Sequence, residues 1–234
     1  MTRRGLQVRY DAVFFDVDGT LLWVHLDVEG YVKDLAPYAT NGSLTVERAK
    51  GPVRESMRRH IEKNIEYRTK EDLAGFKRRN AEITASTLGI RAPTDLLTAV
   101  ADRRISFNPY PESEAVLRGL REMGVGMYVV SNWDLGLAGV LEDLGWMHYF
   151  DGLVVSAVSG VEKPDPRIFE EALEASGVDR RRVVHVGNDP VTDISGAAEV
   201  GIDTVLVDRR GNVLAPEATF VIHDLSELPD VVRG

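Results

Sequence analysis

The stretch AVFFDVDGTLL, residues 12–22, places two carboxylates, Asp16 and Asp18, at the end of a short apolar run. Gly19 and Thr20 follow, and the chain then becomes apolar again. An Asp-Gly pair between two apolar runs is typical of a β-hairpin turn. Two acids at the end of a buried strand are also what a reaction centre needs, so the rest of the chain has to separate the two interpretations.

The partners of the first strand, expected at residues 11–16, lie far along the sequence. From residue 109 onward, apolar runs rich in β-branched residues alternate with helical segments. We expect strands at 125–131, 152–156, 182–187, 203–207 and 219–222, and helices at 112–123, 134–144, 166–176 and 191–200. This alternation predicts right-handed βαβ crossovers and a parallel sheet. The first strand is too short and too apolar to stand alone, so we assign it to the same sheet.

The segment between them, residues 22–106, has a different character. It is long and charged, and its apolar residues recur at helical spacing. We expect about four helices, broken near 39–43, near Thr69 and at 89–93, and no strands. The chain therefore passes from the first strand into helix, which weakens the hairpin interpretation. We predict an α/β core from residues 1–21 and 107–234, with a helical insertion at 22–106.

Composition supports two substructures in one chain. The 234 residues are 44% apolar, enough for a large domain with an insertion. Residues 22–106 hold 15 basic and 12 acidic side chains, a charge of +3, and the remainder carries −12. The net charge of −9 argues against a nucleic acid partner. The absence of cysteine excludes disulfides, thiolate metal sites and a cysteine nucleophile.

No segment predicts a membrane partner or secretion. Apolar runs stay well below the roughly 18 residues of a membrane span. The first ten residues, MTRRGLQVRY, carry charges but no apolar stretch of the kind found in signal peptides. We therefore expect a cytoplasmic protein.

Polar residues follow four of the expected strands, where ligands bind in open parallel sheets. The four clusters are Asp16 to Thr20, Ser131 to Asp134, Glu162 to Asp165 and Gly187 to Asp193. Each has an ordinary explanation, since Asp134 and Asp189 suit helix N-caps and Lys163 suits the protein surface. Those explanations leave unexplained why acids, a hydroxyl and a lysine converge on one sheet edge.

Phosphoryl transfer is the chemistry that uses this set. A carboxylate can attack phosphorus and form an acyl phosphate. A second carboxylic acid can protonate the leaving oxygen and then accept a proton from water. Mg²⁺ prefers carboxylates, carbonyl oxygens and waters, and a hydroxyl, an amide and an ammonium suit the phosphoryl oxygens.

In chain order, these clusters resemble the four motifs of the haloacid dehalogenase superfamily. The stretches GVEKPDPRIFEEAL (160–173) and VVHVGNDPVTDISGAAEVGIDTVLV (183–207) are especially similar to that family. The resemblance covers about residues 10–22 and 107–223. It implies a Rossmann-like core and, because the insertion lies between the first and second motifs, a mobile helical cap of the C1 type.

The resemblance also implies roles for single residues. It makes Asp16 the nucleophile and Asp18 the general acid and base, and it places Lys163 against both phosphate and Asp16. The phosphate-binding residues that it implies are Thr20, Ser131, Asn132 and Lys163.

The same resemblance implies Mg²⁺ between Asp16, the carbonyl of Asp18 and the fourth motif. The family usually has Gly-Asp where this chain has Gly187-Asn188. The remaining metal ligand is then Asn188, through its amide oxygen, or the adjacent Asp189. Asp193, one turn further on, is expected to partner Lys163.

Other residues have weaker patterns. Arg54, Arg58 and Arg59 form a basic cluster on an expected helix, either as a solvated face or as an anion clamp. His185 lies inside an expected buried strand and is interpreted as a core histidine with satisfied hydrogen bonds. Trp23 follows the first motif, where it can line a pocket or pack against a helix.

Together, these features predict a Mg²⁺-dependent phosphatase acting on a small phosphate monoester. A metal-independent 2-haloacid dehalogenase is the main alternative: it shares the Asp nucleophile but needs no acid at Asp18, and Asn188 slightly favours it. A phosphomutase of the same fold stays open. An idle binding protein is disfavoured by the intact Asp16, Asp18 and Lys163, and the absence of a G-x-x-x-x-G-K-[ST] motif disfavours a P-loop kinase.

Overall fold

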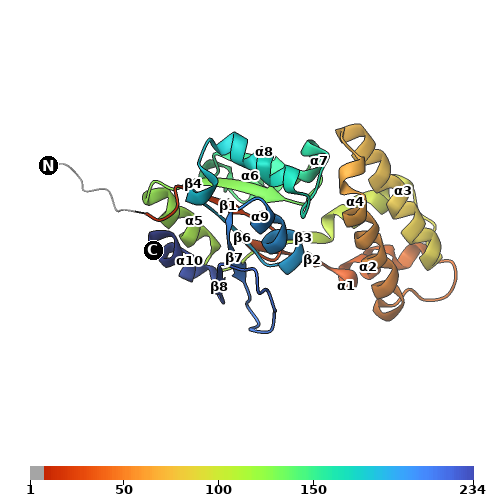
Figure 1. Cartoon of the computed structure of the whole chain (residues 1–234). Coiled ribbons are helices and arrows are strands. Elements are labelled where there is room, and N and C mark those ends of the chain that lie inside the picture. The colour runs from red at the N-terminus through yellow and green to blue at the C-terminus, as the bar shows by residue number, and fades with distance from the viewer. Residues whose placement is uncertain (1–7) are drawn as a thin grey trace. The chain divides into compact units, whose positions relative to one another are not determined.

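The computed structural model describes residues 8–234, and the chain forms two units (Figure 1). Unit 1 combines the chain up to Trp23 with Pro109–Gly234, and unit 2 is Val24–Asn108. Residues 1–7 lie outside the described residues. They include the start of the predicted core and most of the segment in which we expect no signal peptide.

A parallel sheet forms the centre of unit 1. Within residues 8–234, six strands follow the order β5-β4-β1-β6-β7-β8, and neighbouring strands run parallel. The strands are β1 Ala12–Phe15, β4 Gly126–Ser131, β5 Gly152–Val155, β6 Val183–Gly187, β7 Asp203–Val207 and β8 Phe220–Ile222. The strand order reverses at β1, so the crevice at its carboxyl end is the expected ligand site. The predicted α/β class with a Rossmann-like parallel sheet is confirmed.

Helices cover this sheet and bury it on both faces. They are α5 Ser113–Glu122, α6 Leu137–Asp143, α7 Ser156–Ser159, α8 Pro166–Ser176, α9 Gly196–Glu199 and α10 Leu228–Arg233. Ala12 and Phe14 of β1 pack in one cluster with Ile168 and Phe169 of α8. All four β1 residues are buried, as expected for a central parallel strand.

The helix predicted at 191–200 is wrong in type over its first half. The chain forms a π-helix at Pro190–Ser195 and becomes α-helical at α9. Asp189 begins the segment by accepting hydrogen bonds from the N–H groups of Val191 and Thr192. The wider π turn is a common local feature of functional sites.

Four helices form the body of unit 2. They are α1 Val28–Leu35, α2 Val46–Glu62, α3 Lys70–Leu88 and α4 Thr94–Arg103. Thr45 and Thr69 cap α2 and α3 through their hydroxyls, and Gly89 ends α3 with a left-handed φ of 69°. The breaks predicted near 39–43, Thr69 and 89–93 all fall between these helices.

The prediction that this segment has no strands is wrong. β2 Leu22–Leu26 and β3 Ile105–Pro109 pair as a two-stranded sheet at its two ends. Both limits of unit 2 lie two residues later than the predicted 22–106, because the chain passes between the units within these strands. Each strand is five residues long and directly adjoins a helix, so local periodicity does not separate it.

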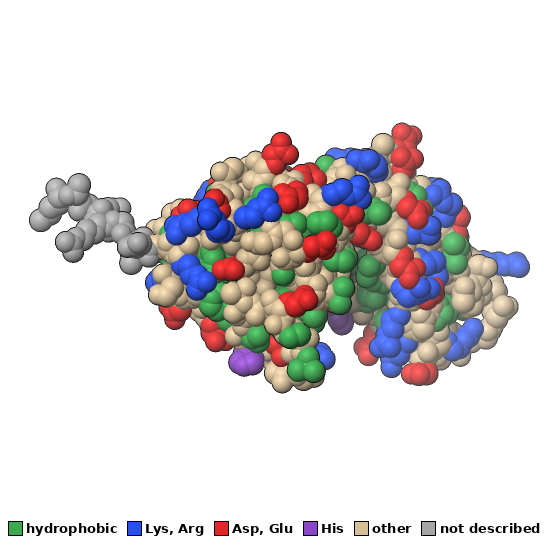
Figure 2. All heavy atoms as spheres, viewed as in Figure 1, with side chains coloured by type: hydrophobic (Ala, Val, Ile, Leu, Met, Phe, Trp, Pro, Cys, Tyr) green, Lys and Arg blue, Asp and Glu red, His purple; other side chains and the backbone are tan. Residues whose placement is uncertain are grey.

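On the face seen in Figure 2, Lys and Arg side chains lie beside Asp and Glu side chains over the helices of unit 2.

Across residues 8–234, every helix is too short or too polar to pass through a membrane.

Candidate active site

Asp16 is the residue on which the site converges. It follows β1 directly, its backbone N–H bonds to the carbonyl of Val186 at 2.9 Å, and its side chain is about nine-tenths buried. Its Oδ1 accepts hydrogen bonds from Lys163 Nζ at 2.7 Å and from Ser131 Oγ at 3.1 Å. Its Oδ2 accepts one from Thr20 Oγ1 at 3.3 Å. Side chains from the ends of β1 and β4 and from the loop between α7 and α8 therefore meet at one carboxylate.

Lys163 links this carboxylate to a second one. Its Nζ lies 2.7 Å from Asp16 Oδ1 and 2.5 Å from Asp193 Oδ1, and its side chain is 2% exposed. Burying an ammonium is costly unless it is paired and hydrogen-bonded. The two acids meet that requirement, because each accepts a hydrogen bond from the ammonium.

The electrostatics of this cluster follow from burial and pairing. Burial raises the pKa of Asp16, and the Lys163 ammonium opposes that rise. Burial alone would lower the pKa of Lys163, but the two carboxylates outweigh it and the pKa is raised. Burial likewise opposes ionisation of Asp193, yet its bonds to Lys163 and His185 hold its pKa well below the ordinary value. The lysine is therefore charged, and Asp193 is its fixed counter-ion.

A glycine makes room for Asp193. A Cβ at Gly187 would lie 2.2 Å from Cγ of Asp193, so any larger residue would displace the carboxylate. Asp193 Oδ2 also accepts a hydrogen bond from the N–H of Asp189 at 2.9 Å. Gly187 is therefore required at this position, because a side chain there would collide with Asp193.

Asn132 holds the lysine loop in place. Its Nδ2 donates to the carbonyl of Lys163 at 2.9 Å, and its Oδ1 accepts from the N–H of Lys163 at 2.7 Å. Its side chain is therefore used within the protein. A phosphate contact by Asn132 would have to use the second Nδ2 hydrogen or the backbone N–H.

Thr20 links the turn after β1 to the segment after β6, which carries Asn188. Its Oγ1 lies 3.3 Å from Asp16 Oδ2 and 3.2 Å from Asn188 Oδ1. Gly19, with φ of 85°, lies so close to Asn188 that a Cβ would be 2.5 Å from Nδ2. The Asn188 amide is therefore seated against the Asp16 to Thr20 turn. Asp18, in that turn, is exposed.

These oxygens suit a hard cation. Among residues 8–234, no group of three or more His, Cys, Asp and Glu side chains is arranged to hold a metal. A magnesium site would need the Asp16 carboxylate, the Asn188 amide oxygen and the Asp18 carbonyl, which form a set of the type that Mg²⁺ accepts. Asp189 is exposed, and one of its two carboxylate oxygens, Oδ1, caps the following π-helix, so Asp189 stays the alternative ligand.

An arginine that was not predicted from the sequence supports this turn. Arg209 follows β7, its guanidinium lies 3.5 Å from the ring centroid of Tyr110, and its Nη2 donates to the carbonyl of Thr20 at 3.0 Å. The next carbonyl, of Leu21, accepts from the hydroxyl of Ser113 at 2.7 Å. The sequence DRRG at 208–211 comes after a strand, as the other four clusters do, and was the available signal.

The predicted arginine cluster of α2 is divided by its contacts. Arg58 is exposed and pairs with Glu55 and Glu62 on the same helix. Arg59 donates to Asn80 Oδ1 at 2.9 Å and to a threonine hydroxyl on α3. Arg54 is exposed, and within the described residues it has no ion-pair partner. Only Arg54 has its full charge available to an anion.

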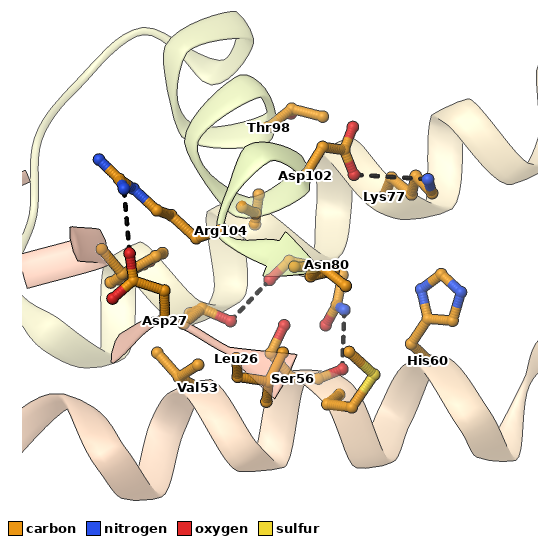
Figure 3. A pocket seen from close by; sticks show the side chains of 16 residues that line it. Leu26, Asp27, Val53, Ser56, His60, Lys77, Asn80, Thr98, Asp102 and Arg104 are labelled. Carbon is orange, nitrogen blue, oxygen red and sulfur yellow. Dashed lines mark hydrogen bonds and ion pairs between the residues drawn. The ribbon is translucent and has the colours of Figure 1, made fainter. Parts of the chain in front are cut away.

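Unit 2 also contains a partly open cavity of about 70 Å³ (Figure 3). Its lining is mostly apolar, and its cations are paired: Lys77 lies 3.4 Å from Asp102, and Arg104 lies 3.0 Å from Asp27. Asn80 Nδ2 donates to the carbonyl of Ser56 at 2.9 Å. The cavity therefore offers no excess positive charge for a phosphate.

Comparisons with known proteins identify the family of the whole chain. A family model described as haloacid dehalogenase-like hydrolase matches residues 10–201. The glyceraldehyde 3-phosphate phosphatase of Methanothermobacter thermautotrophicus is 30% identical over 94% of this chain and 99% of its own length. Haloacid dehalogenase-like hydrolase domain-containing protein 3 of Bos taurus is 42% identical over 41% of this chain, and the match spans 38% of the bovine protein. A crystal structure of 2-haloacid dehalogenase from Pseudomonas syringae pv. Tomato DC3000 is 25% identical, with a TM-score of 0.64, over 95% of this chain and 97% of its own.

Proposed function

Because the chain belongs to the haloacid dehalogenase-like hydrolase family and is an enzyme, we propose that it is a Mg²⁺-dependent phosphatase of small phosphate monoesters. The observation that carries the proposal is the pair of unlike carboxylates in one turn. Asp16 is buried among hydrogen-bond donors, and Asp18 is exposed two residues later. One environment suits a fixed nucleophile, and the other suits a group that exchanges protons.

The proposed reaction has two steps. An oxygen of Asp16 attacks phosphorus, the bond from phosphorus to the ester oxygen breaks, and Asp18 donates a proton to that oxygen. Water then attacks phosphorus, Asp18 accepts a proton from it, and inorganic phosphate leaves Asp16. Each role of Asp18 is the reverse of the other, so one residue serves both steps.

Other side chains hold the phosphoryl group. Lys163 supplies positive charge beside the attacking oxygen, and the hydroxyls of Ser131 and Thr20 flank the same carboxylate. Donors fixed before the reaction stabilise charge that develops at phosphorus without having to reorganise. Asp193 keeps the lysine charged.

Asp16, Asn188 and the carbonyl of Asp18 would hold Mg²⁺, which when bound supplies positive charge for the phosphoryl oxygens. The Thr20 hydroxyl lies within hydrogen-bond distance of both Asp16 and Asn188, and its single proton can be donated to either. Asp193 stays outside the Mg²⁺ set as the partner of Lys163.

A second function is favoured by one feature. Asn188 leaves the metal position without a second carboxylate, and a solved 2-haloacid dehalogenase has a similar structure. In that reaction Asp16 would attack carbon and displace halide, with no proton donor needed at Asp18. The exposed Asp18 in the same turn favours the phosphatase.

We further propose that unit 2 is a C1-type cap that influences substrate choice, and that the enzyme is cytoplasmic. The enzyme would bind small phosphate esters and would act on neither nucleic acid nor membrane. The acidic net charge and the similarity to a phosphatase of a small metabolite support this.

The test is a panel of phosphate esters assayed with Mg²⁺ and with chelator, with 2-chloropropionate measured in parallel. We expect phosphate release that needs Mg²⁺ and no halide release. Halide release that persists in chelator, without phosphate release, would overturn the proposal in favour of the dehalogenase.

A further inference from the structure

His185 is an unusual residue for its position. It lies in the middle of β6, paired with Phe14 of β1 and Thr204 of β7, and is fully buried. Its ring packs edge-to-face on Phe169 of α8, with centroids 5.1 Å apart. Its Nδ1 has no hydrogen-bond partner among the described residues. An apolar side chain would avoid the cost of that unsatisfied nitrogen, so the imidazole calls for an explanation.

The other ring nitrogen reaches the catalytic cluster. His185 Nε2 lies 3.3 Å from Asp193 Oδ1, the oxygen that also accepts from Lys163 Nζ. A carboxylate only accepts, so Nε2 carries the proton of the neutral ring and Nδ1 is bare. Burial lowers the pKa of His185, which keeps it in this neutral form.

Three groups hold the Asp193 carboxylate. Lys163 and His185 share Oδ1, and the N–H of Asp189 holds Oδ2. The histidine is the one among them that comes from a rigid central strand. It therefore defines where Oδ1 lies, and Oδ1 defines one of the two anchors of the lysine.

We propose that His185 is a positioning residue that fixes Asp193, and through it places Lys163 against Asp16. This inference deepens the proposed function and rests on it. Without the Nε2 donor, the Asp193 carboxylate can rotate toward Lys163 and draw the ammonium away from the reacting oxygen. Turnover should suffer more than substrate binding, because the lysine acts on charge that grows in the transition state.

The test compares two substitutions at one site. His185→Met fills the space with an apolar chain and removes the donor, whereas His185→Gln can place an amide nitrogen near the original Nε2. We expect kcat of His185→Met to fall by about 10- to 100-fold, as for other residues that orient catalytic ligands, with KM nearly unchanged. His185→Gln should recover most of that loss. Thr204→Val, at the paired buried position of β7, is the control and should leave kcat unchanged.

Stability and spectroscopy separate this role from a structural one. We expect the Tm of His185→Met to match or exceed that of the wild type. Wild-type kcat in all three variants would overturn the proposal. Losses of kcat that follow losses of Tm, or that are equally large in Thr204→Val, would also overturn it. If His185→Met does not fold, His185→Gln and ¹⁵N NMR of the wild-type imidazole still decide: Nε2 protonated and Nδ1 bare supports the contact, and the reverse tautomer contradicts it.

A failure of the proposed function is recognisable in the same experiment. Wild type that releases no phosphate from the ester panel contradicts the phosphatase, while the NMR result still tests the contact between His185 and Asp193. Wild type that is active together with fully active His185→Met contradicts the positioning role alone.

Discussion

Ion pairs in the two units have similar chemistry and different consequences. In unit 1, the side chains of Lys163, Asp16 and Asp193 are 2%, 10% and 1% exposed. In unit 2, Arg58 and Glu55 pair on one helix with 59% and 42% of their side chains exposed. Exposed pairs are screened by water and contribute little to stability, whereas removing one partner of a buried pair costs about 3–5 kcal/mol.

The two sets also differ in how the chain brings them together. Arg58 meets residues three and four positions away, which any helix would place side by side. Lys163 meets Asp16, 147 residues away, and Asp193, 30 residues away, through the crossing of the sheet. Long-range pairing alone does not distinguish the Asp16 cluster, because Arg104 and Asp27 of unit 2 also pair across 77 residues. What distinguishes Lys163, Asp16 and Asp193 is that their long-range pairs are also buried.

The largest effect should come from the central carboxylate. Asp16→Asn keeps the shape of the side chain but replaces the nucleophile by an amide, so we expect turnover to fall by about 10⁴-fold or more. Phosphate release is the measurement, with mass spectrometry to exclude deamidation back to Asp. Turnover near the wild-type rate in undeamidated protein would remove Asp16 as nucleophile.

The exposed neighbour should matter less. Asp18→Asn should slow hydrolysis by about 10²–10⁴-fold, because a positioned acid and base is lost while the nucleophile stays. The loss should be smaller for esters with good leaving groups, which need little protonation. A phosphatase rate that does not change would show that Asp18 plays no part, and the dehalogenase predicts that outcome for halide release.

A substitution at Asn188 tests the proposed Mg²⁺ ligands. Asn188→Asp should tighten Mg²⁺ by about tenfold, or roughly 1.4 kcal/mol, since an anionic ligand replaces a neutral one. The maximal rate at saturating metal should change little. Without Mg²⁺, the variant should have a lower Tm, because a second carboxylate then lies near Asp16. Calorimetric titration measures the affinity, and unchanged or weaker binding would give Asn188 another role.

The smallest effects belong to unit 2. Arg54→Ala should raise KM for a natural anionic substrate by a few-fold, about what one exposed charge contributes, and less for para-nitrophenyl phosphate. Arg58→Ala should leave KM unchanged because Arg58 is paired with Glu55 and Glu62. Arg59→Ala should lower Tm instead, since it leaves the buried Asn80 and Thr84 without their donor. Equal and negligible effects of all three on KM would make the cluster a solvated face.

Much of the fold could be predicted because its signals are local. The expected strand at 203–207 and helix at 166–176 match β7 and α8 residue for residue. β2 and β3 were missed because their pairing joins segments about eighty residues apart, a contact that hydrophobic periodicity cannot reveal.

The candidate site was also predictable only in part. The segments that carry Asp16, Ser131 and Lys163 could be found from the order of polar clusters along the chain. The uses of single side chains could not, because they depend on packing. Asn132 binds the backbone of Lys163, and His185 leaves one nitrogen without a partner, contrary to the satisfied core histidine that we expected.

The most direct test of the account is to look for the phosphoryl group on Asp16. Asp18→Asn should form the aspartyl phosphate from an ester with a good leaving group and hydrolyse it slowly, because no base activates water. The protein would be mixed with such an ester and Mg²⁺, quenched in acid, digested and analysed by mass spectrometry. The account predicts one phosphoryl group on the peptide containing Asp16, absent from the Asp16→Asn, Asp18→Asn double variant. Phosphate release with no adduct at any quench time, or an adduct on another residue, would contradict it.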